Sequence, residues 1–209
     1  MLVWILGSMA SGKTTLNWKL IDFFSEGKGH KMELKQDAHK GVNFCYSKFP
    51  NVISLGHMKR DSATSGIDPV MGDIKVVGVE KSLELALKED VDCVIMEGAQ
   101  ASSKWFEFVL KNDPKFFLIY LHLDYDDNLN RLKYRQHQKM LKKGELFIQD
   151  HRDVKLSNKN YESIIGKNRQ YANIFANLGH TTPNALKVDA MQSVEDVFSE
   201  VVNFIGERV

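Results

Sequence analysis

The feature that most constrains this chain is the run GSMASGKT at residues 7–14, in which Gly7 and Gly12 precede Lys13 and Thr14. An apolar run at residues 2–6 comes before it, and residues 13–24 have helical spacing. Glycines allow successive backbone N–H groups to curl around phosphate oxygens, and a following helix points its positive end at the same anions. Lys13 is placed to reach the β- and γ-phosphates of a nucleoside triphosphate, and Thr14 is placed to ligate Mg²⁺. The run therefore predicts a phosphate-binding loop (P-loop), with ATP and Mg²⁺ as its ligands.

The residues predicted to bind ATP are Gly7, Ser8, Met9, Ala10, Ser11, Gly12, Lys13, Thr14 and Thr15. Thr14 is also a predicted metal ligand. Lys13 is also a predicted catalytic residue, because its charge lies where negative charge grows during phosphoryl transfer. A plain strand-to-helix turn is the alternative, but such a turn has no need of a Lys-Thr pair at this position.

The rest of the chain alternates short apolar runs with helical stretches, which is typical of βα units around a mostly parallel sheet. Strands are expected at residues 2–6, 31–35, 51–55, 91–96, 116–123 and 185–188. Helices are expected at residues 13–24, 73–89, 102–111, 127–143, 157–178 and from 193 onward. We predict one α/β domain over residues 1–209, a P-loop kinase-like parallel sheet flanked by helices, with a basic helical lid at 128–180.

Charge is unevenly distributed along the chain. The net charge is only +1, yet residues 128–170 hold eleven lysines and arginines against four acids, which gives this segment +7 and the remainder −6. A basic lid on a mildly acidic body suits a polyanionic ligand.

The composition argues against several other classes of protein. Cys45 and Cys93 lack a C-x-x-C spacing, and the seven histidines show no metal-binding spacing, so neither a disulfide nor a zinc site is expected. The apolar runs are too short to span a membrane, and no basic segment precedes the first of them. We therefore expect a cytoplasmic protein with no membrane partner.

Two further signals favour a small kinase over other P-loop proteins. The chain has no N-K-x-D motif for reading guanine and no apolar run that ends in Asp-x-x-Gly. Arg131 and Arg135 lie four residues apart, hence on one helical face, and are predicted to supply charge to the transferring phosphoryl group. The alternative for this pair is an ordinary solvated helix surface.

Acidic residues near the expected strand ends are candidates for the chemistry, because the carboxyl ends of parallel strands line the ligand crevice. Asp37 follows the second expected strand and is predicted to accept the proton of an attacking hydroxyl, whereas Glu97 follows residues 94–96 and is predicted to hold Mg²⁺ through water. A structural role in a strand-ending turn is the alternative for each.

The polar stretch at residues 56–68 is predicted to be a substrate-binding loop. It is basic at its start and punctuated by glycines. Lys59 and Arg60 are candidates to hold a phosphate of the acceptor, and Asp68 is a candidate to bond a sugar or base. An ordinary surface loop is the alternative.

Four segments together resemble the P-loop kinases encoded by bacteriophages, in particular the 5-hydroxymethyluracil DNA kinase group: GSMASGKT (7–14), LGH (55–57), SGID (65–68) and VIMEG (94–98). The resemblance spans roughly residues 2–135, and beyond Arg135 no residue is matched. It implies an enzyme that uses ATP to phosphorylate the 5-hydroxymethyl oxygen of a thymine-like base in DNA. DNA containing a modified pyrimidine is then the expected partner, and the host-cell cytoplasm is the expected location.

Two other functions stay open. A nucleoside or nucleoside monophosphate kinase is the rival within kinases, although many such enzymes carry Asp-Arg where this chain has Glu97 and Gly98. A P-loop ATPase or switch that transfers no phosphate is the rival from a different class.

Overall fold

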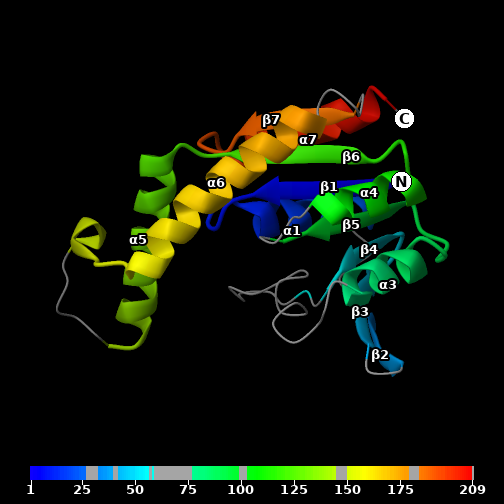
Figure 1. Cartoon of the computed structure of the whole chain (residues 1–209), viewed down its shortest axis with the longest axis horizontal. Coiled ribbons are helices and arrows are strands. Elements are labelled where there is room, and N and C mark those ends of the chain that lie inside the picture. The colour runs from blue at the N-terminus through cyan, green and yellow to red at the C-terminus, as the bar shows by residue number, and fades with distance from the viewer. Residues whose placement is uncertain are drawn as a thin grey trace.

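The computed structural model describes residues 1–26, 33–39, 42–56, 58, 77–98, 103–144, 150–178 and 184–208. Its strands are β1 (Leu2–Gly7), β2 (Glu33–His39), β3 (Val42–Phe49), β4 (Val52–Leu55), β5 (Cys93–Glu97), β6 (Phe117–His122) and β7 (Ala185–Asp189). These strands form a single sheet with the order β2-β3-β4-β5-β1-β6-β7 (Figure 1). The N-terminal strand therefore lies inside the sheet, with a neighbour on each side.

The sheet combines a parallel block with an antiparallel edge. β4, β5, β1, β6 and β7 all run parallel, whereas β3 is antiparallel to both β4 and β2. The predicted α/β fold with a mostly parallel sheet is confirmed. The prediction placed a strand at residues 31–35 and missed β3, so the β2–β3 hairpin is a correction to it.

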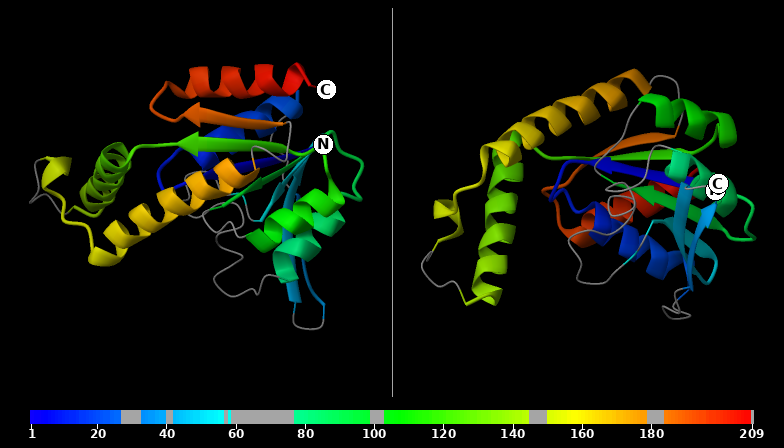
Figure 2. Two further views of the ribbon diagram at one scale, coloured as in Figure 1. Left: turned by 45° about the horizontal axis from the view of Figure 1, so that its top comes forward. Right: turned by 60° about the horizontal axis from the view of Figure 1, so that its bottom comes forward.

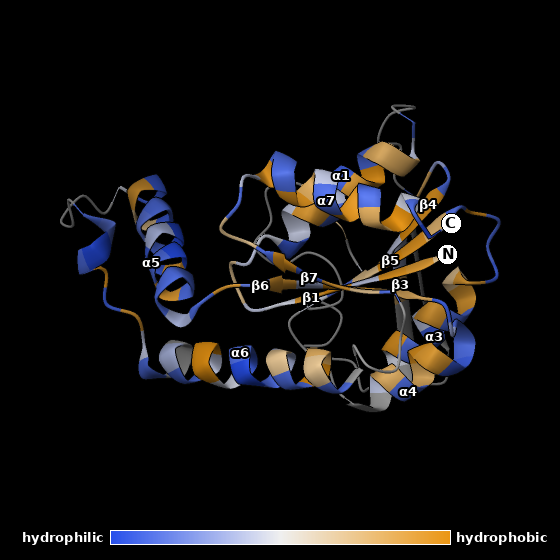
Figure 3. Ribbon diagram, turned by 90° about the horizontal axis from the view of Figure 1, so that it is seen from above, coloured by the Kyte–Doolittle hydropathy of each residue, from blue (hydrophilic) through white to orange (hydrophobic). Residues whose placement is uncertain are grey.

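Helices cover both faces of the sheet. They are α1 (Lys13–Phe24), α3 (Val77–Ala86), α4 (Ser103–Asn112), α5 (Tyr125–Lys142), α6 (Asn158–Leu178) and α7 (Val194–Gly206), with a short 3₁₀ helix η1 (His151–Asp153). Figure 3 shows α1 and α7 on one face and α3, α4 and α6 on the other. Most observed bounds lie within a few residues of the expected ones, and α1 matches its expected range. Ser193, where the last helix was expected to start, is the N-cap of α7, and its Oγ accepts a hydrogen bond from the Asp196 N–H at 3.1 Å.

Alternate residues of β1 pack into two separate apolar layers. Leu2, Trp4 and Leu6 join the layer beneath α3, α4 and α6, whereas Val3 and Ile5 join the layer beneath α1 and α7. All five side chains are at most 1% exposed. A strand buried on both faces reads as a continuous apolar run, which explains why residues 2–6 carry no polar alternation.

The predicted lid divides into two structurally different parts. Figures 1 and 2 show α5 standing apart from the sheet, beyond the end at which β1 and β6 point, and α6 running back along the sheet. The later half of α6 belongs to the core, since Tyr171 is fully buried and Ile174 and Phe175 pack on the same layer. We use the name basic arm for α5 with its C-cap Lys143 and for η1 with its N-cap Asp150, residues 125–143 and 150–153.

Candidate active site

The P-loop connects β1 to α1 through a backbone that depends on small residues. A Cβ at Gly7 would lie 2.4 Å from Ser11 Oγ and 3.0 Å from Leu121 O, so a side chain there would displace Ser11 and crowd the Leu121 carbonyl. Gly12, at the N-cap of α1, has a φ of 94°, which favours glycine. Ala10 also has a positive φ, 64°, a conformation that costs free energy for a residue with a Cβ. The loop therefore holds the tight curvature that its sequence predicts.

Lys13 is folded back over this loop. Its side chain is only 7% exposed, and its Nζ donates to the carbonyl oxygens of Gly7 at 2.9 Å and Ser8 at 2.8 Å. Two consecutive carbonyls thus fix the ammonium group at the first turn of α1. Lys13 is also the first residue of α1, so its positive charge adds to that of the helix N-terminus, which favours an anion.

Two buried hydroxyls in the loop indicate whether a phosphate group would fit there. Ser8 and Ser11 are each 2% exposed, and their Oγ atoms have no hydrogen-bond partner within the described part of the chain. Buried polar atoms are normally satisfied in folded proteins. A phosphate group has the acceptor oxygens that both hydroxyls and the loop N–H groups require, so the residues present fit the predicted ligand.

The two predicted metal ligands, Thr14 and Glu97, meet at the carboxyl edge of the sheet. Ile5 of β1 lies opposite Glu97 of β5, and Thr14 Oγ1 donates to Glu97 Oε1 at 3.0 Å. Glu97 is 1% exposed. Mg²⁺ prefers oxygen ligands and is usually held by one or two carboxylates together with phosphate oxygens and water, so this pair fits it.

The two predicted arginines lie on α5 and are half-buried. Arg131 donates through its Nη2 to the carbonyl oxygen of Ala190 at 2.6 Å, in the turn between β7 and α7. The structure therefore directs Arg131 to this turn. The prediction that Arg131 and Arg135 act on the phosphoryl group stays a prediction.

The reasoning that selected Asp37 needs a correction. Asp37 does not follow a parallel strand: it lies within the antiparallel β2, opposite Phe44 of β3. The error arose because a short polar strand gives no local signal of its direction or length. Tyr46 lies opposite Leu55, the last residue of β4, so the part of the hairpin that holds Asp37 and Phe44 extends beyond the carboxyl end of β4. The backbone at Asp37 is thus still on the side of the sheet to which the P-loop belongs.

Lys59, Arg60 and Asp68, the predicted substrate-binding residues, lie outside the described residues. The start of their segment is described, and buried hydrogen bonds anchor it. Ser47 Oγ donates to Gly56 O at 2.9 Å and accepts from the Met58 N–H at 3.0 Å. The segment therefore leaves β4 from a fixed point.

Two fully buried asparagines were missed by the sequence analysis. Asn17, on α1 four residues after Lys13, donates to Ser54 Oγ at 2.9 Å and so ties α1 to β4. Asn128, in the first turn of α5, donates to the carbonyl oxygen of Met9 in the P-loop. Helical spacing would have indicated that Asn17 shares a face with Lys13. No local signal marks Asn128, because its partner lies 119 residues away in the sequence.

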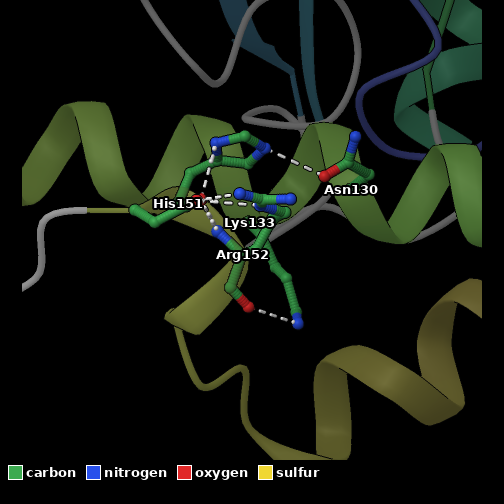
Figure 4. A network of polar contacts seen from close by, with 5 residues as sticks. Asn130, Lys133, His151 and Arg152 are labelled. Atoms are coloured by element: carbon green, nitrogen blue, oxygen red, sulfur yellow. Dashed lines mark hydrogen bonds and ion pairs between the residues drawn. The ribbon is translucent and has the colours of Figure 1, made fainter.

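Exposed polar contacts hold the turn of the basic arm (Figure 4). Arg152 donates to Asp150 through its backbone N–H at 2.8 Å and through its guanidinium, and Lys133 donates to the Arg152 carbonyl at 2.8 Å. His151 Nε2 lies 3.0 Å from Asn130 Oδ1. The hydrogen bonds from the Arg152 side chain and backbone hold the pKa of Asp150 well below its usual range. We call these five residues the arm clasp.

Comparison with known proteins gives structural likenesses only. No family model and no curated protein matches the chain. Among solved structures, it is similar to the YorR protein of Bacillus subtilis in complex with phosphorylated GDP, at 14% identity and a TM-score of 0.49, over 99% of this chain and 96% of that chain. It is also similar to a deoxyadenosine kinase of M. mycoides with bound dATP, at 13% identity and a TM-score of 0.48, over 99% and 100% of the two chains. Neither likeness assigns an activity or an acceptor to this chain.

Within the residues that the structure describes, none of the helices has the length and apolarity needed to cross a membrane.

Proposed function

We propose that this protein is an ATP-dependent kinase that transfers the γ-phosphate to a hydroxyl of a nucleic-acid component. The observation that carries the proposal is the convergence of Lys13, Thr14 and Glu97 at the carboxyl edge of β1 and β5. The loop beside them holds two buried hydroxyls that have no hydrogen-bond partner among the described residues. Such a P-loop edge brings together ATP, the Mg²⁺ that accompanies it and the acceptor hydroxyl.

Each residue of the site has a separate task in this proposal. The loop N–H groups and the Ser8 and Ser11 hydroxyls bind the phosphate chain, and Lys13 exchanges its carbonyl partners for β- and γ-phosphate oxygens. Thr14 and Glu97 would hold Mg²⁺, whose charge would stabilise the negative charge that develops on the transferring phosphoryl group. Arg131 and Arg135 lie on α5, whose first turn contacts the P-loop through Asn128, and in this proposal they supply charge to the transferring phosphoryl group.

We propose the 5-hydroxymethyl group of 5-hydroxymethyluracil in DNA as the acceptor, because both the resemblance and the basic arm support a polymer. α5 has 18 residues and is therefore about 27 Å long. The exposed Lys139 and Lys142 lie in its last turn and the exposed Lys143 is its C-cap, about 12–18 Å along the helix axis from Arg131. A mononucleotide bound beside the P-loop is too short to need these lysines, whereas a DNA backbone presents a phosphate at each nucleotide.

Asp37 remains the proposed general base, since the hairpin that carries it extends past the carboxyl end of β4. General bases of this kind contribute about 10²–10⁴ in rate. Asp37→Asn should therefore lower the transfer rate while leaving ATP affinity unchanged. Full activity of this variant across pH would move the search for the base to Asp61 or Asp68.

Transfer of labelled γ-phosphate tests the proposal. The purified protein is supplied with ATP and Mg²⁺ and, in separate reactions, with water alone, free nucleosides and nucleoside monophosphates, RNA, and DNA with and without 5-hydroxymethyluracil. Label on the modified DNA alone supports the full proposal. Label on a free nucleotide identifies a nucleoside or nucleoside monophosphate kinase, and release of phosphate into water with no labelled acceptor identifies an ATPase.

A further inference from the structure

Asn128 links the basic arm to the P-loop through a buried amide. It is fully buried in the first turn of α5, and its Nδ2 donates to the carbonyl oxygen of Met9. A carbonyl oxygen can only accept, so the amide must present its NH₂ group to Met9. Asn128 Oδ1 has no hydrogen-bond partner within the described residues, so the Met9 contact is the interaction that the buried amide makes there.

The contact lies next to a residue with an unfavourable backbone conformation. Met9 is followed by Ala10, whose φ of 64° lies in the left-handed region that residues with a Cβ rarely adopt. Such a conformation persists only where neighbouring groups enforce it. Asn128 supplies such enforcement from another element, because it binds the carbonyl directly before Ala10.

The same contact also decides where an N–H group points. The Met9 carbonyl and the Ala10 N–H belong to one peptide group, which is planar and trans, so the two bonds point in opposite directions. A Met9 carbonyl held by Asn128 therefore turns the Ala10 N–H away from α5. Rotation of this peptide would exchange the two directions and present an oxygen where a donor now lies.

We propose that Asn128 is a positioning residue that holds the Met9–Ala10 peptide so that the Ala10 N–H donates to a phosphate of the bound nucleotide. The inference rests on the proposed function in that it requires an ATP site, but it requires no particular acceptor. It also gives α5 a role in nucleotide binding. One turn after Asn128, Arg131 holds the Ala190 carbonyl, so two buried or half-buried contacts fix the start of the arm beside the P-loop.

The variant Asn128→Leu tests the proposal, because leucine has nearly the shape of asparagine but no donor. Affinity is measured by calorimetry with Mg²⁺ and the β,γ-imido analogue of ATP, so no turnover is needed. We expect Kd to rise about tenfold, which corresponds to about 1.4 kcal/mol. We expect Tm to change little, because the substitution also removes a buried oxygen that has no partner in the described structure. Asn130→Leu, an exposed change on the same helix, is the matched control and should leave Kd unchanged.

A merely structural role predicts the opposite pattern, a lowered Tm with an unchanged Kd, and that result would overturn the proposal. A second measurement needs no variant. In ¹⁵N-labelled wild-type protein, the Ala10 N–H should gain protection from hydrogen exchange when the analogue binds, and an Ala10 N–H that gains none would also overturn it. Failure of the wild type to bind the analogue would overturn both this inference and the proposed function. Binding without transfer to any acceptor would overturn the proposed function alone.

Discussion

The P-loop edge of the sheet and the basic arm are both polar, but they hold their polar groups in different ways. At the edge, Lys13, Glu97 and Asn128 are at most 7% exposed, and each bonds a group from another part of the site. In the arm, the clasp between Asp150 and Arg152 joins residues two positions apart, and the Arg152 side chain is 76% exposed. Buried contacts tolerate substitution poorly, whereas exposed ones are screened by water and salt. The edge should therefore respond sharply to single changes and the arm only to several.

The largest expected effect is that of Lys13→Ala. Removing the ammonium group should lower transfer by about 10²–10³ or more, since groups that stabilise transition-state charge contribute on that order. The fold should persist, because α1 is held by Leu16 and Leu20 in the core. Initial rates and a thermal melt measure both quantities. Lys19→Ala, a change at a partly exposed lysine of the same helix, is the control, and near-normal turnover of folded Lys13→Ala protein would remove the basis of the proposed function.

Glu97→Gln should have the next largest effect. Glutamine preserves the oxygen that accepts from Thr14 but removes the negative charge that favours a cation. We expect the Mg²⁺ concentration for half-maximal rate to rise about 10–100-fold, the range typical of lost support for a metal. High Mg²⁺ should restore part of the rate. The control is Glu84→Gln, on the exposed face of α3, and a Glu97→Gln protein with an unchanged metal requirement would exclude Glu97 from the metal site.

The sequence predicted those features that local residues determine and missed those that depend on contacts between distant residues. The parallel block was predictable, because strands buried on both faces give continuous apolar runs and the P-loop pattern has a fixed local geometry. The β2–β3 hairpin was not, since Asp37 lies in a polar strand whose direction is set by its pairing with Phe44. The site residues divide in the same way, into those predicted from local sequence and those that were missed. The pair Thr14 and Glu97 came from a motif and a strand end, whereas Asn128 depends on a contact across 119 residues.

The arm should respond to the combined substitution of Lys139, Lys142 and Lys143 by glutamine. If each lysine neutralises one DNA phosphate, the slope of log affinity against log salt should become shallower by about 0.9 per contact on duplex DNA and about 0.7 on single strands. Affinity at low salt should fall about tenfold or more, while the KM for ATP stays unchanged. Binding of hydroxymethylated DNA at two salt concentrations measures this.

The control for that experiment is the triple substitution of exposed lysines on the body, at Lys111, Lys115 and Lys187. It removes the same charge at a distance from the arm and should alter the slope little. A flat salt response in the wild type, with an unaffected arm variant, would contradict the DNA acceptor and favour a free nucleotide.

The smallest expected effect concerns the arm clasp and its dependence on pH. Hydrogen bonds from Arg152 lower the pKa of Asp150 in the folded protein, so the carboxylate supports the clasp fully above its unfolded pKa of about 3.9 and loses that role as pH falls below this value. The Arg152 N–H, which donates to Asp150 Oδ1, should therefore be protected from hydrogen exchange near pH 6 and lose protection on acidification below about pH 4. Asp150→Ala should abolish the protection at both values, while Asp153→Ala, an exposed acid in the same turn, should preserve it. Because the clasp is exposed, we expect a change of only a few-fold, with no effect on ATP binding. Protection independent of pH in the wild type would show that the Lys133 and His151 contacts hold the turn without Asp150.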